Sequence, residues 1–360
     1  MTSTSHPVFN ENTESLDVAE AFAARIHEKT ILITGVNLGG IGFATAKAFA
    51  SQSPSHLIIA GRNPSRLQES IDALKAHFPS VDYRALKLDL SSQKAVREAA
   101  AEVLSWNDVP TIDIIMNNAA VMNIPELTLT EDGLETQFAT NHIGHFLFTC
   151  LVMPKLVKAA QSSAKGDTRI INVTSLSPTM ASMRWSDINY EKINKTLPVE
   201  EQPDYATHKR WGAIDPENKS YLPLEGYNQG KVANVLFGIG INKRLYDKFG
   251  ILSLAVHPGI IRTELSRYAS SETREAIEEF FKKGLIQAKT LGAGAATSLV
   301  AATDPALGLP VVTKDGKENY GAYLIDCQIS DNARASSVSS SEAEKLWALS
   351  ETLVKERFAW

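Results

Sequence analysis

The stretch "KTILITGVNLGGIGFATAKAFA", residues 29–50, contains a short apolar run, a cluster of glycines and a helix-like run of small residues. Glycines between a strand and a helix let the backbone approach a pyrophosphate closely, and amides at the helix N-terminus attract its negative charge. Nucleotide-binding turns of this kind commonly read T-G-x-x-x-G-x-G, but here four residues, not three, separate Gly35 from the Gly40-Ile41-Gly42 end. The stretch predicts a cofactor-binding turn, and an ordinary glycine turn without a ligand stays open as the alternative.

Strand-like and helix-like patterns alternate along the rest of the chain. The strands are short apolar runs without polar alternation, which is typical of strands buried on both faces of a parallel sheet. They are predicted at residues 30–34, 56–60, 83–88, 112–116, 169–174, 251–257 and 321–326. Helices are predicted at residues 41–52, 64–77, 92–106, 131–160, 227–249, 290–303 and 341–357. This order predicts an α/β fold, a single Rossmann-type doubly wound parallel sheet of about seven strands with helices on both faces.

The bulk composition narrows the class of protein. The chain has 360 residues, of which 44% are hydrophobic and 21% charged, and a formal net charge of -5, as expected for a soluble globular protein without nucleic-acid partners. The N-terminus lacks the basic and apolar regions of a secretory signal, and no run of about 18 apolar residues predicts a transmembrane anchor. With only two cysteines, Cys150 and Cys327, we expect a reduced, cytoplasmic location and small-molecule partners. No His, Cys or carboxylate spacing suggests a metal site.

Polar residues follow successive predicted strands. Arg62 follows the second strand, Asp89 and Leu90 the third, and Asn118 and Ala119 the fourth. Because the carboxyl ends of parallel strands share one edge, these residues are expected to line one crevice with the glycine turn. A guanidinium at the second strand end suits the 2'-phosphate of NADP, whereas NAD sites place a carboxylate there, and none is present. Arg62 as a solvated surface charge and Asp89 as a turn former stay alternatives.

Tyr227 and Lys231 are four residues apart in the predicted helix 227–249 and therefore lie on one face of it. An ammonium beside a phenol favours the phenolate and lowers the pKa of the phenol. Such a phenol can pass a proton to or from an alcohol or ketone oxygen. The same spacing occurs by chance in many helices, so a purely structural role is the alternative.

Several motifs follow one another in a fixed order. They are Thr34-Gly35 with Gly40-Ile41-Gly42, Asn117-Asn118-Ala119, Asn141, Ser175 at the end of the fifth predicted strand, Tyr227 with Lys231, and His257-Pro258-Gly259 with Thr263. In this combination the chain resembles the short-chain dehydrogenase/reductase family over about residues 28–327. Within the family it is most similar to the retinol dehydrogenase and WW-domain-oxidoreductase branch, and especially to fungal reductases of secondary metabolism.

The resemblance implies a role for each matched position. Tyr227 is expected to be the general acid or base, Ser175 to hydrogen-bond the substrate oxygen, and Asn141 to support a water-mediated proton relay. Lys231 is expected to hold the nicotinamide ribose and to lower the pKa of Tyr227, and Thr263 to contact the nicotinamide carboxamide. The implied cofactor site consists of Gly35, Asn37, Leu38, Gly40, Ile41, Gly42, Arg62, Asp89, Leu90, Asn118, Ala119, Tyr227, Lys231, Pro258, Gly259 and Thr263. The implied reaction is hydride transfer between NADP(H) and a hydrophobic ketone, aldehyde or secondary alcohol, such as a polyketide, terpenoid, steroid or retinoid.

The chain departs from the family pattern at three places. The glycine turn is one residue longer, Ala120 replaces the last glycine of Asn-Asn-Ala-Gly, and Tyr227 lies 52 positions after Ser175, a much longer interval than in the simplest members. We therefore expect residues 176–226 to be an insertion beside the substrate pocket and residues 262–289 to be its lid. The aromatic residues of the insertion either face a lipophilic ligand or pack the insertion onto the body, and packing is the favoured reading.

The domain body is expected at residues 29–360, after a flexible N-terminal extension at residues 1–28 that contains a short helix. Family members commonly pair through the helices predicted at 92–106 and 131–160, so a homodimer is one expected state and a monomer the other. A catalytically silent dinucleotide-binding regulator or scaffold is the alternative function. Sugar-nucleotide epimerases and dehydratases usually show G-x-x-G-x-x-G at the first turn, which this sequence does not match.

Overall fold

The computed structural model describes residues 3–360, and an eight-stranded sheet lies at its centre. The strands are β1 (Thr30–Thr34), β2 (His56–Gly61), β3 (Asp82–Lys87), β4 (Ile114–Asn117), β5 (Arg169–Val173), β6 (Leu252–His257), β9 (Tyr323–Ile325) and β10 (Gln328–Ile329). Their order across the sheet is β10-β9-β6-β5-β4-β1-β2-β3, and all neighbours are parallel except β10, which is antiparallel to β9. The seven parallel strands are those predicted, so the Rossmann-type sheet is confirmed.

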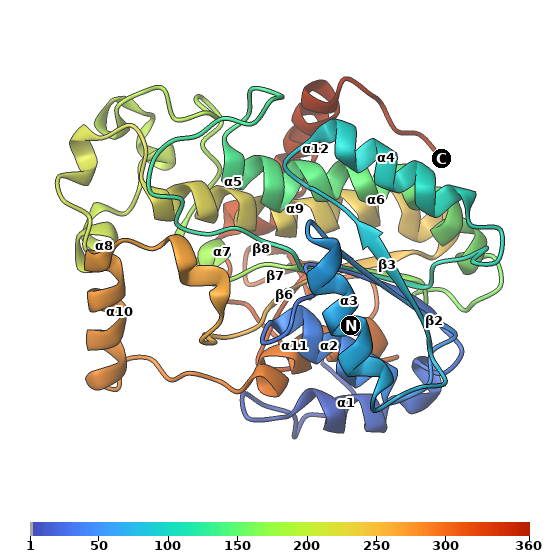
Figure 1. The fold of residues 1–360 in the computed structure, drawn as a ribbon. Helices are drawn as coiled ribbons and strands as arrows, with labels where there is room; N and C mark the ends of the chain where they lie inside the picture. Colours follow the sequence, from blue (N-terminus) through green and yellow to red (C-terminus); the bar gives the residue numbers. More distant parts are fainter. Residues whose placement is uncertain (1–2) are drawn as a thin grey trace.

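Helices cover both faces of this sheet, one group above it and one below it in Figure 1. The upper group is α4 (Gln93–Ser105), α6 (Gly144–Ala160), α9 (Pro223–Phe249) and α12 (Ser340–Val354). The lower group is α1 (Ser15–Ala21), α2 (Ile41–Ala50), α3 (Pro64–Lys75) and α11 (Leu291–Thr303). Along β1, Leu32 belongs to the core under the upper group, and Ile31 and Ile33 belong to the other core. This alternation explains why the central strands are apolar on both faces.

Local signals set the helix boundaries that matter for the site. Asn63 accepts hydrogen bonds from the amides of Ser65 and Arg66 and so caps α3, which starts at Pro64. Helix α9 starts at Pro223 and ends at Gly250, whose φ of 76° suits glycine. The predicted start at residue 227 was four residues late, and the second turn of a regular helix therefore carries the tyrosine.

The strand order reverses on either side of β1, since β1 lies between β2 and β4. The loops after β1 and β4 therefore leave the sheet edge side by side and open a crevice at the carboxyl ends of the strands. This is the edge at which the glycine turn and the predicted polar residues meet.

The helix predicted at 131–160 is divided into α5 (Thr136–Phe138), the π-helix η2 (Ala139–Ile143) and α6. Among residues 3–360, Thr136–Ala160 is the single helical segment long and apolar enough to cross a membrane, but its apolar window is 72% buried inside the protein. That degree of burial is typical of a core helix.

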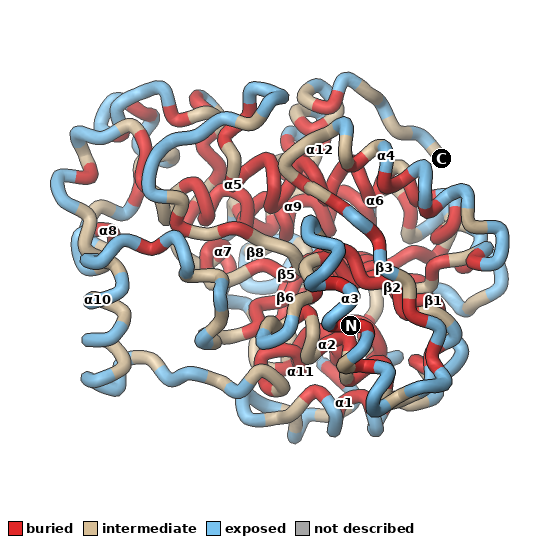
Figure 2. Tube along the Cα trace, in the orientation of Figure 1, coloured by how far each residue is buried: buried red, intermediate tan, exposed pale blue. Residues whose placement is uncertain are grey.

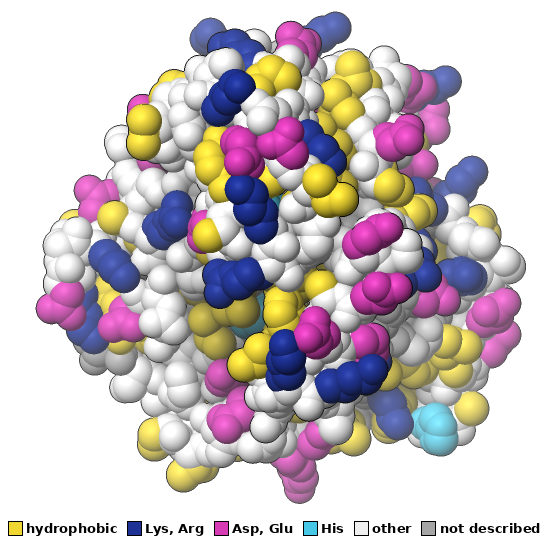
Figure 3. All heavy atoms as spheres, turned by 90° about the vertical axis from the view of Figure 1, so that its left-hand side faces the viewer, with side chains coloured by type: hydrophobic (Ala, Val, Ile, Leu, Met, Phe, Trp, Pro, Cys, Tyr) yellow, Lys and Arg dark blue, Asp and Glu magenta, His cyan; other side chains and the backbone are white. Residues whose placement is uncertain are grey.

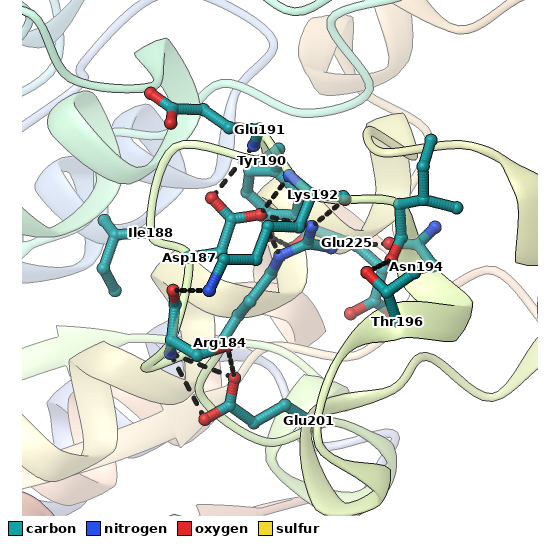
Figure 4. Close-up of polar contacts among 12 residues, drawn as sticks. Arg184, Asp187, Ile188, Tyr190, Glu191, Lys192, Asn194, Thr196, Glu201 and Glu225 are labelled. Atoms are coloured by element: carbon teal, nitrogen blue, oxygen red, sulfur yellow. Dashed lines mark hydrogen bonds and ion pairs between the residues drawn. The ribbon is translucent and has the colours of Figure 1, made fainter.

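The insertion at residues 176–226 holds the short helices α7 (Ser177–Met180) and α8 (Tyr205–Arg210) and a polar core of its own. Figure 4 shows Arg184 at the centre of that core. Its guanidinium donates to Asp187 Oδ2 at 2.6 Å and to Asn194 Oδ1, and it stacks 4.5 Å above the ring of Tyr190. Because Arg184 and Asp187 are both buried, this ion pair depends on its complete set of partners.

The segment at residues 262–289 holds the 3-10 helix η6 (Glu264–Tyr268) and helix α10 (Ser271–Lys282). Helix α10 has no buried residue and stands at the edge of the molecule beside α8 (Figures 1 and 2). Phe280 packs edge-on against Trp211 of the insertion at 5.3 Å between ring centroids. One aromatic contact thus joins the two segments that interrupt the regular βα pattern.

Two features were not predicted. Strands β7 (Val311–Lys314) and β8 (Lys317–Tyr320) form a separate, largely exposed hairpin, and β10 adds two residues to the sheet edge. The N-terminal segment carries the expected short helix, but it is also attached to the body: Thr4 donates to Gln328, and the Ser5 amide donates to Asp304. These contacts hold the segment against the domain, although its sequence favours flexibility.

Candidate active site

The glycine turn takes a conformation that explains its extra residue. The Gly40 amide donates to the Asn37 carbonyl at 3.0 Å, and Gly39 within this turn has a φ of 75°. Gly40 then forms the N-cap of α2, while Leu38 at the tip of the turn is 47% exposed. The additional residue is therefore absorbed in a tight turn over Asn37–Gly40, and the amides of Ile41 and the residues after it start the helix.

Two glycines are required for close packing. A Cβ on Gly35, whose φ is 73°, would lie 2.6 Å from the Cα of Ala119, and a Cβ on Gly42 would lie 2.5 Å from the Gly35 carbonyl oxygen. By contrast, no atom lies within 4 Å of a Cβ placed on Gly39. Gly35 and Gly42 thus bring the turn against the end of β4, and Gly39 serves only the backbone conformation.

A groove of about 280 Å³ runs along the carboxyl edge of the sheet. The predicted cofactor residues that line it are Gly35, Asn37, Gly40, Ile41, Gly42, Arg62, Leu90, Asn118, Ala119, Tyr227, Lys231, Pro258 and Thr263. The structure thus gathers positions that are more than 200 residues apart along one continuous surface.

Three predicted cofactor residues do not line this groove: Leu38, Asp89 and Gly259. Leu38 lies at the exposed tip of the turn. The Asp89 carboxylate accepts hydrogen bonds from the amide and the hydroxyl of Ser91, at 3.0 and 2.6 Å, and so shapes the turn before α4. The contacts of Asp89 therefore match the alternative reading, in which this residue forms a turn, because its carboxylate oxygen accepts from its own loop.

A buried histidine supports the glycine turn. His145 Nδ1 lies 3.1 Å from the Asn141 carbonyl, which can only accept, so this nitrogen carries the hydrogen. Burial lowers the pKa of His145 to about 3, so the ring is neutral and its Nε2 accepts from the Thr34 hydroxyl at 2.9 Å. The Thr34 oxygen then accepts from the amides of Asn118 and Ala119, each at 3.0 Å. This chain of donors and acceptors ties β1, β4 and helix α6 together.

Asn141 lies in the π-helix η2 and is completely buried. Its side-chain amide exchanges two hydrogen bonds with the backbone of Val121, both at 2.9 Å. It also packs against helix α9, because a Cβ on Gly230 would lie 2.9 Å from the Asn141 Cβ. A π-helix changes the backbone hydrogen-bond pattern around Asn141, and such irregularities are frequent at functional sites.

Tyr227 and Lys231 lie on the same face of α9, with the ammonium nitrogen 5.6 Å from the ring centroid. Burial raises the pKa of Tyr227 well above its usual range, against a smaller opposite effect of the Ser175 hydroxyl. Burial also lowers the pKa of Lys231 to about 7, and its ammonium donates to the Val173 carbonyl at 2.8 Å. The net direction for Tyr227 is thus opposite to the lowering predicted from the spacing, because desolvation of the phenol outweighs the hydrogen bond from Ser175.

The hydroxyl of Ser175 has a defined donor direction. Ser177 donates to Asn228 Oδ1 at 2.7 Å, since that oxygen can only accept. The hydrogen between Ser175 and Ser177, whose hydroxyl oxygens are 2.6 Å apart, must therefore come from Ser175. Ser175 also accepts from the Ser177 amide at 3.0 Å, and its carbonyl accepts from Tyr323 Oη at 2.7 Å. The hydroxyl and the carbonyl of Ser175 are thus held by neighbours that the motifs did not reveal.

This chain continues into the insertion. The Asn228 amide donates to Glu225 Oε1 at 2.9 Å, and His208 Nε2 lies 2.6 Å from the same oxygen. Tyr190 Oη donates to the Glu225 carbonyl at 2.8 Å. Glu225 therefore connects α8 and the Arg184 core, where Figure 4 shows it, to the helix that carries Tyr227.

The far end of the groove is rich in arginine. Arg62, Arg66 and Arg267 line it together with Glu264. Arg66 was not predicted to bind the cofactor. It lies in the first turn of α3, four residues after Arg62, and the sequence shows this spacing. Arg267 and Glu264 belong to the segment at residues 262–289, and no sequence pattern connects that segment to the end of β2.

The aromatic residues of the insertion have packing partners. Trp185 donates to Glu342, Tyr190 and Tyr221 pack edge to face at 5.4 Å, and Trp211 contacts Phe280. None of these insertion aromatics lines the groove. Within residues 3–360 no cluster of His, Cys, Asp or Glu side chains has the arrangement of a metal site.

Comparison with known proteins agrees with this geometry. The family model described as short chain dehydrogenase matches residues 29–187. Oxidoreductase fscI of Fusarium equiseti is 37% identical over 252 residues, which are 70% of this chain and 95% of that protein. Chloroplastic short-chain dehydrogenase TIC 32 A of Brassica napus is 32% identical and covers 91% of this chain and 88% of its own. Human retinol dehydrogenase 13 is 34% identical and covers 68% of this chain and 62% of its own.

Solved structures share the fold. A protein from Mycobacterium paratuberculosis matches with a TM-score of 0.59 at 24% identity, covering 93% of this chain and 96% of that one. A short-chain dehydrogenase from Sphingobium yanoikuyae, solved in complex with NADPH, matches with a TM-score of 0.52 at 20% identity, covering 76% of this chain and 83% of that one.

Proposed function

Because this chain belongs to the short-chain dehydrogenase/reductase family, we propose that it is an NADP(H)-dependent oxidoreductase acting on hydrophobic ketones or aldehydes, or on the corresponding secondary alcohols. The observation that carries the proposal is the single groove in which Tyr227 and Lys231 share a surface with the glycine turn and Arg62. We assign Tyr227 the role of proton donor and Lys231 that of ribose ligand. The glycine turn would bind the pyrophosphate, and Arg62 would bind the 2'-phosphate.

The residues present suit a dinucleotide. Gly35 and Gly42 let the backbone pack without side chains at the start of α2, and the amides of Ile41 and Gly42 would hold the pyrophosphate there. Arg62 would hold the 2'-phosphate through charge-assisted hydrogen bonds, and Lys231 would hold the nicotinamide ribose. When bound, the nicotinamide ring supplies or accepts the hydride.

The proton of the reaction would come from Tyr227. Because burial keeps its pKa well above neutral pH, the phenol is protonated and can donate to a carbonyl oxygen during reduction. Ser175 would turn its hydroxyl from Ser177 to donate to that oxygen, while the Ser177 amide keeps the serine in place.

Apolar lining of the groove near Tyr227 supports a hydrophobic substrate. Val121 and Val173 lie beside the tyrosine end, and Leu265 enters from the lid. An apolar wall with few polar groups favours lipophilic ligands of the polyketide, terpenoid, steroid or retinoid kind. The insertion aromatics add no support, since they pack against other side chains.

The decisive test is a screen of NADPH oxidation with structurally varied lipophilic ketones and aldehydes, run in parallel with NADH. Tyr227→Phe should reduce turnover of any substrate found by at least about 100-fold, because general acid catalysis is removed, while the Kd for NADPH stays within about twofold. Tyr83→Phe is the matched control, since that phenol donates to the Phe78 carbonyl away from the groove.

Full turnover by Tyr227→Phe would refute the assigned mechanism. NADPH binding without oxidation across the whole panel would instead support the silent dinucleotide-binding alternative. A strong preference for NADH would overturn the role of Arg62.

A further inference from the structure

Segment 262–289 contacts the cofactor groove at its arginine-rich end. The Arg66 guanidinium on α3 donates to the Glu264 carboxylate of η6 at 2.9 Å, and both side chains are more than half exposed. Glu264, Leu265 and Arg267 of η6 line the same groove as Arg62. The segment expected to cover the substrate therefore also borders the site proposed for the 2'-phosphate.

Two arginines at this end, Arg267 and Arg62, act on the side chain of Tyr268. The Arg267 guanidinium stacks 4.6 Å from the ring of Tyr268. A hydrogen bond from Arg267 and the charges of Arg267 and Arg62 lower the pKa of Tyr268, against its slight burial. The phenol of Tyr268 is thus near enough to respond to the charges of Arg267 on the lid and of Arg62 at the end of β2.

The charge at this end matches a phosphate monoester. Arg62, Arg66 and Arg267 carry three positive charges, and Glu264 carries one negative charge, which leaves a net +2. A phosphate monoester carries about -1.5 to -2 near neutral pH. A guanidinium fork binds two phosphate oxygens at once, so several arginines can share one phosphate.

Arg267 is also connected to the rest of the lid. Its carbonyl accepts from the Arg274 guanidinium of α10 at 3.0 Å. Arg262, at the start of the segment, pairs with Glu278 of α10 at 2.7 Å. Helix α10 has no buried residue, and besides these polar contacts it is held by the Phe280 contact with Trp211 and by the Arg262 guanidinium 4.2 Å from the Phe281 ring. Figure 3 shows the side of the molecule on which α8 and α10 lie, and acidic and basic side chains are interspersed on it.

We infer that Arg267 joins Arg62 and Arg66 in binding the 2'-phosphate of NADP(H), so that the phosphate that selects the cofactor also fastens the lid over the groove. This inference rests on the proposed function, because it deepens the NADP(H) site described above. In the free protein the Glu264 carboxylate pairs with the Arg66 guanidinium, and its negative charge would repel the incoming phosphate. The lid thereby responds to the 2'-phosphate and not to the adenosine alone.

The first experiment measures Kd for NADPH and NADH by titration of nicotinamide fluorescence. Arg267→Ala should lower the preference for NADPH over NADH by about tenfold, as expected for one charge-assisted hydrogen-bond pair. Arg62→Ala should lower it at least as much, and Glu264→Gln should raise it. Lys282→Ala, an exposed cation of α10, is the matched control and should leave the preference unchanged.

The second experiment measures hydrogen–deuterium exchange of residues 264–284 with 2',5'-ADP or 5'-AMP as the probe. In the wild type, 2',5'-ADP should slow exchange in this segment and 5'-AMP should not. In Arg267→Ala, neither probe should slow it.

The outcomes separate the two proposals. If Arg62→Ala leaves the cofactor preference unchanged, the NADP(H) proposal itself fails. If Arg62→Ala lowers the preference but Arg267→Ala matches the Lys282→Ala control, the NADP(H) site stands and the lid inference is overturned. Equal slowing of exchange by 2',5'-ADP and 5'-AMP would also overturn it.

Discussion

His208 Nε2 lies 2.6 Å from Glu225 Oε1, and this contact joins the long insertion to the helix that carries Tyr227. The same carboxylate oxygen accepts from the Asn228 amide, whose oxygen in turn accepts from Ser177 beside Ser175. The insertion therefore does more than lengthen the chain between Ser175 and Tyr227. It completes the hydrogen bonds that set the donor direction of Ser175.

Removing this connection should impair catalysis without impairing cofactor binding. Glu225→Ala should lower kcat by about tenfold, because Asn228 and Ser177 lose the contacts through which they hold the Ser175 side chain in position, and should leave the Kd for NADPH unchanged. Glu225→Gln should restore much of the rate, since its carbonyl oxygen still accepts from Asn228. Glu217→Ala removes a partly buried carboxylate of the same insertion that pairs with Lys209 and makes no contact with Asn228 or Ser177, and it serves as the control. A loss of NADPH affinity equal to the loss of kcat would show a general structural effect instead.

Two neighbouring glycines should respond differently to alanine. Gly42→Ala should abolish NADPH binding, because its Cβ would lie 2.5 Å from the Gly35 oxygen and 2.7 Å from Asn118 Nδ2. Gly39→Ala should cost about 1 kcal/mol of stability from its positive φ, and should change the Kd for NADPH little, since the space around it is open. Thermal unfolding and NADPH titration of both variants check this. Equal losses of affinity would contradict the assignment of Gly39 to backbone conformation alone.

Burial of Lys231 should make stability depend on pH. Its pKa in the folded protein is about 7, below the usual 10.5, so the buried ammonium destabilises the fold fully below pH 7. Between pH 7 and 10.5 only the unfolded chain stays protonated, so stability rises with pH and the penalty fades. Lys231→Met should therefore raise Tm most near pH 6 and progressively less toward pH 10, while abolishing turnover. A Tm difference that is constant from pH 6 to pH 10 would contradict the lowered pKa.

The C-terminal segment should keep the protein monomeric. Arg97 of α4 donates to Glu356 and to the Val354 carbonyl, and Phe358 packs against Phe146 of α6 at 5.8 Å. The C-terminal tail thus covers part of the helices through which family members commonly pair. Light scattering after size exclusion should give a mass near 39.2 kDa, and deletion of residues 355–360 should promote association through the uncovered apolar surface. A dimer of the intact chain would rule out this role of the tail.

Some of the fold could be read from short stretches of sequence, because the signals are local. The central parallel strands are apolar runs whose burial on both faces excludes polar alternation, and Thr30–Thr34 was predicted to the residue. The edge strand β3 instead alternates between buried and more exposed residues. The hairpin of β7 and β8 was missed because its residues are mostly exposed and polar, so no buried face marks it. The two residues of β10 are too few to form a pattern.

The candidate site, like the fold, could be predicted from the sequence only in part. The sequence by itself determined the chemistry available: a phenol and an amine one helical turn apart, a serine at a strand end, and a glycine turn before a helix. Only the tertiary structure decided how these groups are held, as with the desolvation that raises the pKa of Tyr227 and the chain from Ser175 to His208. The same is true of Arg267, which reaches the groove from a separate segment. The physical reason is that motifs record residue types at short spacings, whereas burial and hydrogen-bond direction depend on groups brought together from distant parts of the chain.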